Sequence, residues 1–260
     1  MNHSDFLLER FVHHILKDDP RDSRAGAGRT IFADALSAGA DPRWLLSEIL
    51  WPAAECTQQL RHDQIITPRV FNHAVRTLAN LASQLAPAAA SKIPATQRFL
   101  FIASAPGEPS DLGAHLLSIL AESHGFSVQF AGANLSASDI LFALNRLEPH
   151  AVILHGSLVD SFLPTQNLLA KLRHAELWPK IQFATAGAML ENHPGTADIS
   201  AQHPVELLEL LALCPDHRAA GDSPLQQEPL HFLTDPTACP HGDAVRDLLF
   251  HYFPPRRHAN

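Results

Sequence analysis

Residues 98–125 read RFLFIASAPGEPSDLGAHLLSILAESHG, and this stretch decides the fold. Its first seven residues are an apolar run typical of a buried strand, and the apolar residues after Asp111 recur as in an amphipathic helix. The loop between them contains Gly107 and Gly113, which suit a turn and a close helix start. In a doubly wound sheet, a loop at the carboxyl end of the first strand is where ligands bind. The stretch therefore predicts a ligand-binding loop.

The pattern of strand and helix continues along the chain. Further apolar runs are residues 126–132, 151–157, 180–188 and 197–200, and amphipathic segments are residues 136–148, 163–177 and 204–214. Short apolar strands that alternate with helices indicate a parallel sheet covered on both faces, with right-handed crossovers. We therefore predict an α/β domain over residues 98–214, a doubly wound, Rossmann-like (flavodoxin-like) fold with five parallel strands.

The first ninety residues predict helices alone. Apolar residues recur near helical spacing in residues 5–16, 30–39, 41–60 and 67–85. Asp41 and Thr67 each precede a proline, which is typical of a capped helix start. We predict a small helical bundle over residues 1–90, and a linker with the domain boundary in the Pro-bearing residues 87–97.

The last residues, 215–260, are rich in Pro, Asp and His and predict an irregular C-terminal extension, with one short helix over residues 243–253. Two Cys-Pro pairs fall at its start and within it. Together with two nearby histidines they are typical of short heme-regulatory motifs or of a zinc site, although neither spacing is specific. These four residues are Cys214, His217, Cys239 and His241.

Composition excludes several classes of protein. Lys and Arg number 19 against 27 Asp and Glu, giving a net charge of -8, and no basic cluster predicts direct binding to nucleic acid. No apolar window is long enough for a membrane span, and the amino-terminal residues do not resemble a signal peptide. Three cysteines argue against a disulfide framework. We expect a cytoplasmic protein.

Catalytic motifs are missing from the sequence. Neither a phosphate-binding glycine loop nor a G-x-S-x-G nucleophile elbow is present. Glu108 and Asp111 at the mouth of the first loop would repel a bare phosphate, and Ser110 or Asp111 is a candidate cap for the helix that follows. We therefore expect a protein that is not an enzyme.

A helical bundle followed by a doubly wound domain whose first loop reads G-E-x-S-D-x-G resembles the cobalamin-binding modules of corrinoid proteins and B12-dependent regulators. The resemblance covers residues 40–214. In that family the bundle caps the corrin, the first loop reads [DE]-x-H-x-x-G with the histidine as lower cobalt ligand, and a serine motif and a Gly-Gly turn hold the nucleotide tail. The matching positions here are Glu108, Ser110, Asp111 and Gly113 in the first loop, His155, Gly156, Ser157 and Leu158 after strand three, and Gly187 after strand four.

Two departures from the family pattern concern the ligand. Ser110 stands where the family has its ligand histidine, and a hydroxyl is a far poorer cobalt ligand than an imidazole. Alanine stands beside Gly187 where the family has a second glycine. The Trp and Glu-His of light-sensing members are also replaced, by Leu60, Val70 and Phe71, so we expect no adenosylcobalamin photochemistry.

The short chain is most similar to the AerR/PpaA-like antirepressors and to the related heme-binding version of the domain. This resemblance implies a regulatory sensor that binds a tetrapyrrole (cobalamin, heme or a bilin) and acts on a transcriptional repressor or another regulatory protein. Two alternatives remain open: a corrinoid methyl carrier of a methyltransferase system, and a ligand-free adaptor whose pocket is filled by side chains such as Leu112, Leu158 or Met189. Whether the chain forms a homodimer also stays open.

Three histidines are candidates to ligate the metal of a tetrapyrrole. His155, at the end of the third predicted strand, is the first candidate for an axial ligand, and the alternative is that it bonds a loop carbonyl. His115 lies just inside the first helix of the sheet domain, where a solvated position is the alternative. His73 lies on the bundle helix that would cap the ligand, with a sideways position toward a polar surface as its alternative.

Overall fold

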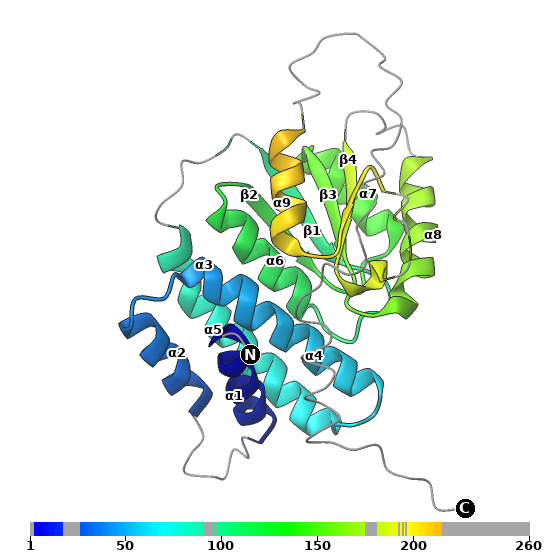
Figure 1. Ribbon diagram of the computed structural model, residues 1–260. Helices are drawn as coiled ribbons and strands as arrows, with labels where there is room; N and C mark the ends of the chain where they lie inside the picture. The colour runs from blue at the N-terminus through cyan, green and yellow to red at the C-terminus, as the bar shows by residue number, and fades with distance from the viewer. Residues whose placement is uncertain are drawn as a thin grey trace, which may run out of the picture. The chain divides into compact units, whose positions relative to one another are not determined.

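The computed structural model describes residues 3–17, 27–90, 96, 98–174, 181–191, 193, 195 and 197–214 (Figure 1). They form two compact units, and the boundary between the units falls within helix α5, between Leu78 and Ala79. Three of the four residues of the predicted Cys and His cluster, namely His217, Cys239 and His241, lie outside the described residues, as does the predicted helix over 243–253. No described helix is long and apolar enough to cross a membrane.

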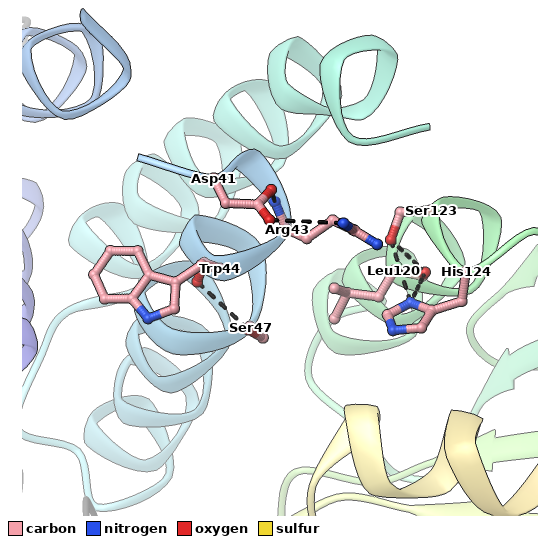
Figure 2. A network of polar contacts seen from close by, with 7 residues as sticks. All are labelled: Asp41, Arg43, Trp44, Ser47, Leu120, Ser123 and His124. Carbon is pink, nitrogen blue, oxygen red and sulfur yellow. Dashed lines mark hydrogen bonds and ion pairs between the residues drawn. The ribbon is translucent and has the colours of Figure 1, made fainter. Parts of the chain in front are cut away.

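The first unit consists of helices, as predicted. They are α1 (His3–Lys17), α2 (Ala27–Ser37), α3 (Pro42–Leu45), the π-helix η1 (Leu46–Leu50), α4 (Trp51–His62) and the start of α5 (Pro68–Ala90). The predicted caps are confirmed: Asp41 Oδ1 accepts the N–H of Arg43 at 3.0 Å (Figure 2), and Thr67 Oγ1 accepts the N–H of Val70 at 3.3 Å. Each cap satisfies a backbone donor that the first helical turn leaves unpaired.

The segment predicted as one helix over residues 41–60 is divided by the π-turn of η1. Pro52 has no N–H to donate to the carbonyl of Glu48, and its ring crowds that carbonyl. The backbone widens there, so that the N–H of Trp51 bonds the carbonyl of Leu46, five residues earlier.

Helix α5 extends into the predicted linker. The helix contains Pro87 and continues to Ala90, although residues 87–97 have no apolar period. Leu85 and Ala89 are buried on either side of the proline, and alanine is the best helix former, so packing and propensity together offset the one lost hydrogen bond.

Buried aliphatic and aromatic side chains form the core of the first unit. Phe11 and Phe32 pack with ring centroids 4.6 Å apart, joining α1 to α2. The stripe predicted on α5 is confirmed for Ala74 and Leu78, which are buried in this unit, and for Leu81, which is buried on the part of α5 that belongs to the second unit. Fully buried side chains on α1, α3, η1 and α4 complete this core: Ile15, Leu45, Leu46, Ile49, Leu50, Trp51 and Leu60.

The second unit is built on a five-stranded parallel sheet, which confirms the predicted α/β fold. Its strands are β1 (Phe99–Ser104), β2 (Ser127–Gly132), β3 (Ala151–His155), β4 (Gln182–Ala186) and β5 (Ile199–Ala201). The strand order is β2-β1-β3-β4-β5, with every neighbouring pair parallel. The two central strands, β1 and β3, are nearly continuous apolar runs because both of their faces are covered.

Helices cover both faces of this sheet (Figure 1). They are α6 (Leu112–Ser123), α7 (Ala137–Leu147), α8 (Phe162–Arg173) and α9 (Pro204–Leu213), with the short 3-10 turns η2 (Val159–Ser161) and η3 (Ala188–Leu190). Phe101, Leu154 and Phe183 of the sheet pack against α7 and α8 in one core cluster. Because successive strand residues face opposite sides, the side chain of His155 lies on the other face, toward α6.

Two polar side chains form hydrogen bonds at the C-terminal end of α6. His124 Nδ1 lies 2.8 Å from the carbonyl oxygen of Leu120, and the hydroxyl of Ser123 donates to the same oxygen at 2.7 Å (Figure 2). The same oxygen also accepts the backbone N–H of His124 at 3.1 Å, so the two side chains add to a backbone hydrogen bond at the end of the helix. The start of β1 is fixed in turn by Arg98, whose guanidinium donates to the carbonyls of Leu211 and Cys214 at the end of α9.

Candidate functional site

Strands β1, β3 and β4 end at the same level of the sheet. Ser104 is the register partner of His155, and His155 is the register partner of Ala186. The loops that follow these strands therefore meet at one edge of the sheet, which we call the ligand edge. It is the place where a doubly wound fold binds ligands, and it contains the loops predicted from sequence.

Glu108 joins the loop after β1 to the loop after β3. Its Oε1 accepts the N–H of Ser157 at 2.9 Å, the N–H of Leu158 at 3.3 Å and the hydroxyl of Ser161 at 2.6 Å. Its Oε2 accepts the hydroxyl of Ser157. We call this group of four hydrogen bonds the Glu108 clamp. It brings together three residues that the sequence predicted for the site, namely Glu108, Ser157 and Leu158.

The carboxyl group in the clamp is buried, since Glu108 is only 6% exposed. Burial raises the pKa of Glu108 above its ordinary value, while the hydrogen bonds from Ser157, Ser161 and Leu158 act in the opposite direction. All four donors point at the carboxyl oxygens, so the clamp replaces the water that this group loses on folding.

His155 is buried inside the ligand edge. A Cβ added at Gly113 would overlap Cε1 of the His155 ring, and a Cβ added at Gly187 would lie 2.8 Å from its Nε2. The ring therefore lies between the start of α6 and the turn after β4. Burial lowers the pKa of His155 to about 3, so the imidazole is neutral at physiological pH. Its predicted role as an axial metal ligand remains a prediction.

Apolar side chains fill the rest of the ligand edge. Met189 is fully buried, and Leu112 and Leu158 are 1% and 7% exposed. Met189 and Leu190 form a small cluster with Ala105 at the end of β1. Leu112, Leu158 and Met189 were given as examples of side chains that would fill the pocket of an adaptor, and all three are buried.

Ser110 and Asp111 lie at the start of α6. The hydroxyl of Ser110 accepts the N–H of Leu112 at 3.4 Å, a weak capping contact, while the side chain of Asp111 makes no capping hydrogen bond. Ser110 is half-buried and Asp111 is exposed. Ser110 therefore fits the capping role that the sequence offered for it.

The two remaining candidate histidines take no part in the hydrogen bonds of the Glu108 clamp. His115 is half-buried on α6, with its ring 5.4 Å from that of Phe130, and burial lowers the pKa of His115. His73 is half-buried on the part of α5 that belongs to the first unit. Among the described residues, no three His, Cys, Asp or Glu side chains form a group that could hold a metal ion.

Sequence analysis missed Ser161, which donates to Glu108, and Phe162, which stacks on His193 at 4.5 Å and covers the cluster around Met189. Ser161 carries a usable signal. Its hydroxyl lies four residues after Ser157, in a loop predicted to lie at the same end of the sheet as Glu108, and a buried carboxylate needs several donors.

Comparison with known proteins identifies the fold. The structure of the monomethylamine corrinoid protein from Methanosarcina barkeri matches with a TM-score of 0.63 and 15% sequence identity, over 80% of this chain and 98% of that chain. The chain thus has a corrinoid-protein fold. This finding confirms the predicted cobalamin-binding type of architecture. No protein-family model and no curated protein sequence matches the chain.

Two further structures match more weakly. A cobalamin-binding protein from Desulfitobacterium hafniense DCB-2 has a TM-score of 0.40 and 16% identity, over 82% of this chain and 98% of that chain. The methanol:cobalamin methyltransferase complex from Methanosarcina barkeri has a TM-score of 0.37 and 16% identity, over 80% of this chain and 79% of that chain.

The ligand edge of this corrinoid-protein fold does not fit a corrinoid held as the family resemblance implies. Ser110 offers a hydroxyl where the family has an imidazole ligand for cobalt. The glycines assigned to the nucleotide tail are also in contact with this chain's own atoms. The space beside Gly187 is taken by the carbonyl oxygen of Gly156 and by the ring of His155, and the space beside Gly156 is taken by Met189. A tail placed there would overlap both side chains.

Proposed function

We propose that this chain is a regulatory sensor that responds to a tetrapyrrole and acts on a transcription factor through protein contact, without catalysing a reaction itself. The corrinoid-protein fold supports this proposal, and cobalamin is for that reason the first tetrapyrrole to test. Heme and bilins are the others that the proposal covers. The poor fit of the ligand edge restricts the proposal to binding that leaves a nucleotide tail outside the space filled by His155.

The observation that carries the proposal is the Glu108 clamp. A sensor needs an element whose position changes when the ligand binds. The clamp holds the loops after β1 and β3 together through one buried carboxyl group, with donors from Ser157, Leu158 and Ser161. Any ligand that entered this edge would have to move or break these bonds, so the position of both loops is linked to occupancy of the edge.

Visible absorption tests the ligand half of the proposal. The full-length protein is incubated separately with aquacobalamin, hemin and biliverdin, desalted, and its spectrum recorded. We expect one of the three to remain bound at about one equivalent. The Glu108→Ala variant lacks the hydrogen bonds that join the loops after β1 and β3. We therefore expect its affinity for the bound tetrapyrrole to differ from that of the wild type by about fivefold or more. The exposed Ser138 provides the control, and Ser138→Ala should bind as the wild type does.

Testing the regulatory part of the proposal requires a protein partner. Crosslinking in the source cells identifies candidate transcription factors, and the affinity of each purified candidate is then measured with and without the bound tetrapyrrole. The proposal predicts that the two affinities differ. Equal affinities for every candidate, or a protein that retains none of the three tetrapyrroles, would rule out a sensor of this kind.

A second candidate function is a ligand-free adaptor that kept the fold. The burial of Leu112, Leu158 and Met189 in the ligand edge favours it. The adaptor predicts no tetrapyrrole absorption, together with binding to a transcription factor that is independent of added ligand. The same pair of measurements therefore separates the adaptor from the sensor.

The remaining alternative, a corrinoid methyl carrier, has less support from the site. Ser110 caps α6 and offers no imidazole to cobalt. Methyl transfer from the methylcobalamin-loaded protein to the acceptor substrate of a partner methyltransferase, which leaves cob(I)alamin on the protein, would establish this function and would contradict the regulatory role proposed above.

A further inference from the structure

Three glycines from separate elements surround the side chains that fill the ligand edge, and we call them the glycine cradle: Gly113, Gly156 and Gly187. A Cβ at Gly113 would lie 2.6 Å from Nδ1 of His155. One at Gly187 would overlap the carbonyl oxygen of Gly156 and would lie 2.8 Å from Nε2 of His155 and 3.1 Å from its Cδ2. A Cβ at Gly156 would lie 3.0 Å from Cβ and Cγ of Met189 and would overlap its Sδ. The cradle and the two side chains therefore exclude further atoms.

Backbone conformation does not explain why glycine occupies positions 113 and 156. Only Gly187, with a φ of 98°, has a positive φ, where glycine is favoured. Gly113 is the second residue of α6, a place where glycine is one of the least favourable residues and alanine the best. What requires a glycine at this position is the space taken by the His155 ring.

The backbone of His155 is fixed by the centre of the sheet. Its carbonyl accepts the N–H of Ala105 at 2.7 Å, and its neighbours in register are Ser104 on one side and Ala186 on the other. The residue is 1% exposed. The ring thus belongs to a rigid part of the fold, in contrast to a side chain on an exposed loop.

We propose that His155 is an internal plug of the ligand edge, whose imidazole fills the glycine cradle and keeps external aromatic rings out of it. This inference concerns only which side chain occupies the glycine cradle. It holds for an adaptor and for a sensor that binds its tetrapyrrole outside the cradle, and it is incompatible with a carrier whose nucleotide tail enters the cradle. Removal of the ring leaves a space of the size and shape of a flat five-membered heterocycle, so free imidazole is the probe.

The first test is Gly113→Ala, measured by thermal unfolding of the full-length protein. The plug predicts a lower Tm for Gly113→Ala in the wild type, where the new methyl group meets the ring. In the His155→Ala background the same change should raise the Tm, because alanine favours the helix once the ring is gone. A higher Tm for Gly113→Ala in the wild type, or the same loss in both backgrounds, would overturn the proposal.

The second test measures the Tm of His155→Ala as imidazole is added. A ligand that binds only the folded state stabilises it, so the Tm should rise with imidazole concentration. Leu154→Ala is the matched control, since Leu154 is the neighbouring buried residue of β3 on the opposite face of the sheet. The wild type and Leu154→Ala should not respond. An equal rise in all three proteins, or no rise in folded His155→Ala, would contradict the plug.

Discussion

Two buried ionisable residues, Glu108 and His155, determine the chemistry of the ligand edge. Glu108 is surrounded by donors and keeps its place through hydrogen bonds. His155 has its ring between glycines and is held in its neutral form by burial. For both residues, burial is the first cause of the shift in pKa. The stability of the second unit should therefore depend on pH through each of them.

Glu108→Gln isolates the contribution of the carboxyl group. A glutamine can still accept three of the hydrogen bonds through its carbonyl oxygen, and it carries no charge. The pKa of Glu108 is raised in the folded state, so the stability that the protonated form contributes is fully present below the unfolded pKa, near 4.5, and is lost as pH rises through the folded pKa. We expect the free energy of unfolding of the wild type, minus that of the variant, to fall over this range.

Urea unfolding of both proteins at a series of pH values measures this difference. Because His155 is present in both proteins, its own titration cancels in the subtraction, as long as the two sites are independent. A difference that rises with pH would mean that the hydrogen bonds of the clamp outweigh burial and that the pKa of Glu108 is lowered.

At the scale of single elements, local sequence signals account for the starts of α3 and α5. Asp41 with Pro42 and Thr67 with Pro68 were predicted as caps and act as caps. The π-turn of η1 and the extension of α5 through Pro87 were not predicted. In both places a proline removes one helical hydrogen bond, and the cost is met by packing that local propensity does not contain.

The cap at Asp41 offers a test at this scale. Asp41→Ala removes the oxygen that accepts the N–H of Arg43 and should lower the free energy of unfolding by about 1 kcal/mol. Asp34→Ala is the control, because Asp34 is an exposed acid within α2 and does not precede the helix. Urea titration of both variants measures the difference, and an equal effect of the two substitutions would show that charge, and not capping, is responsible.

At the scale of the whole molecule, the alternation of apolar runs with amphipathic segments was sufficient to predict the parallel sheet. The corrinoid-protein type of this fold was predicted from the resemblance of its loop motifs to those of a known family, and not from the apolar pattern. The contact between Glu108 and Ser157 could also have been predicted from the sequence, because strands β1 and β3 end at the same edge of the sheet. The roles of Ser161 and of the His155 ring could not, since they depend on which side chain fills a space between three distant segments. Packing of that kind has no periodic signature in a sequence.

The central claim of this account is that the chain's own side chains close the ligand edge of a corrinoid-protein fold. Nitrogen-15 NMR of the imidazole groups, with His155 assigned by comparison with His155→Gln, tests it most directly. Burial places the pKa of His155 at about 3, so its ring should stay neutral from about pH 8 to about pH 5 while exposed histidines titrate. A His155 signal that titrates near the ordinary value of 6.5 would show a solvated ring and an open edge, and would contradict the account.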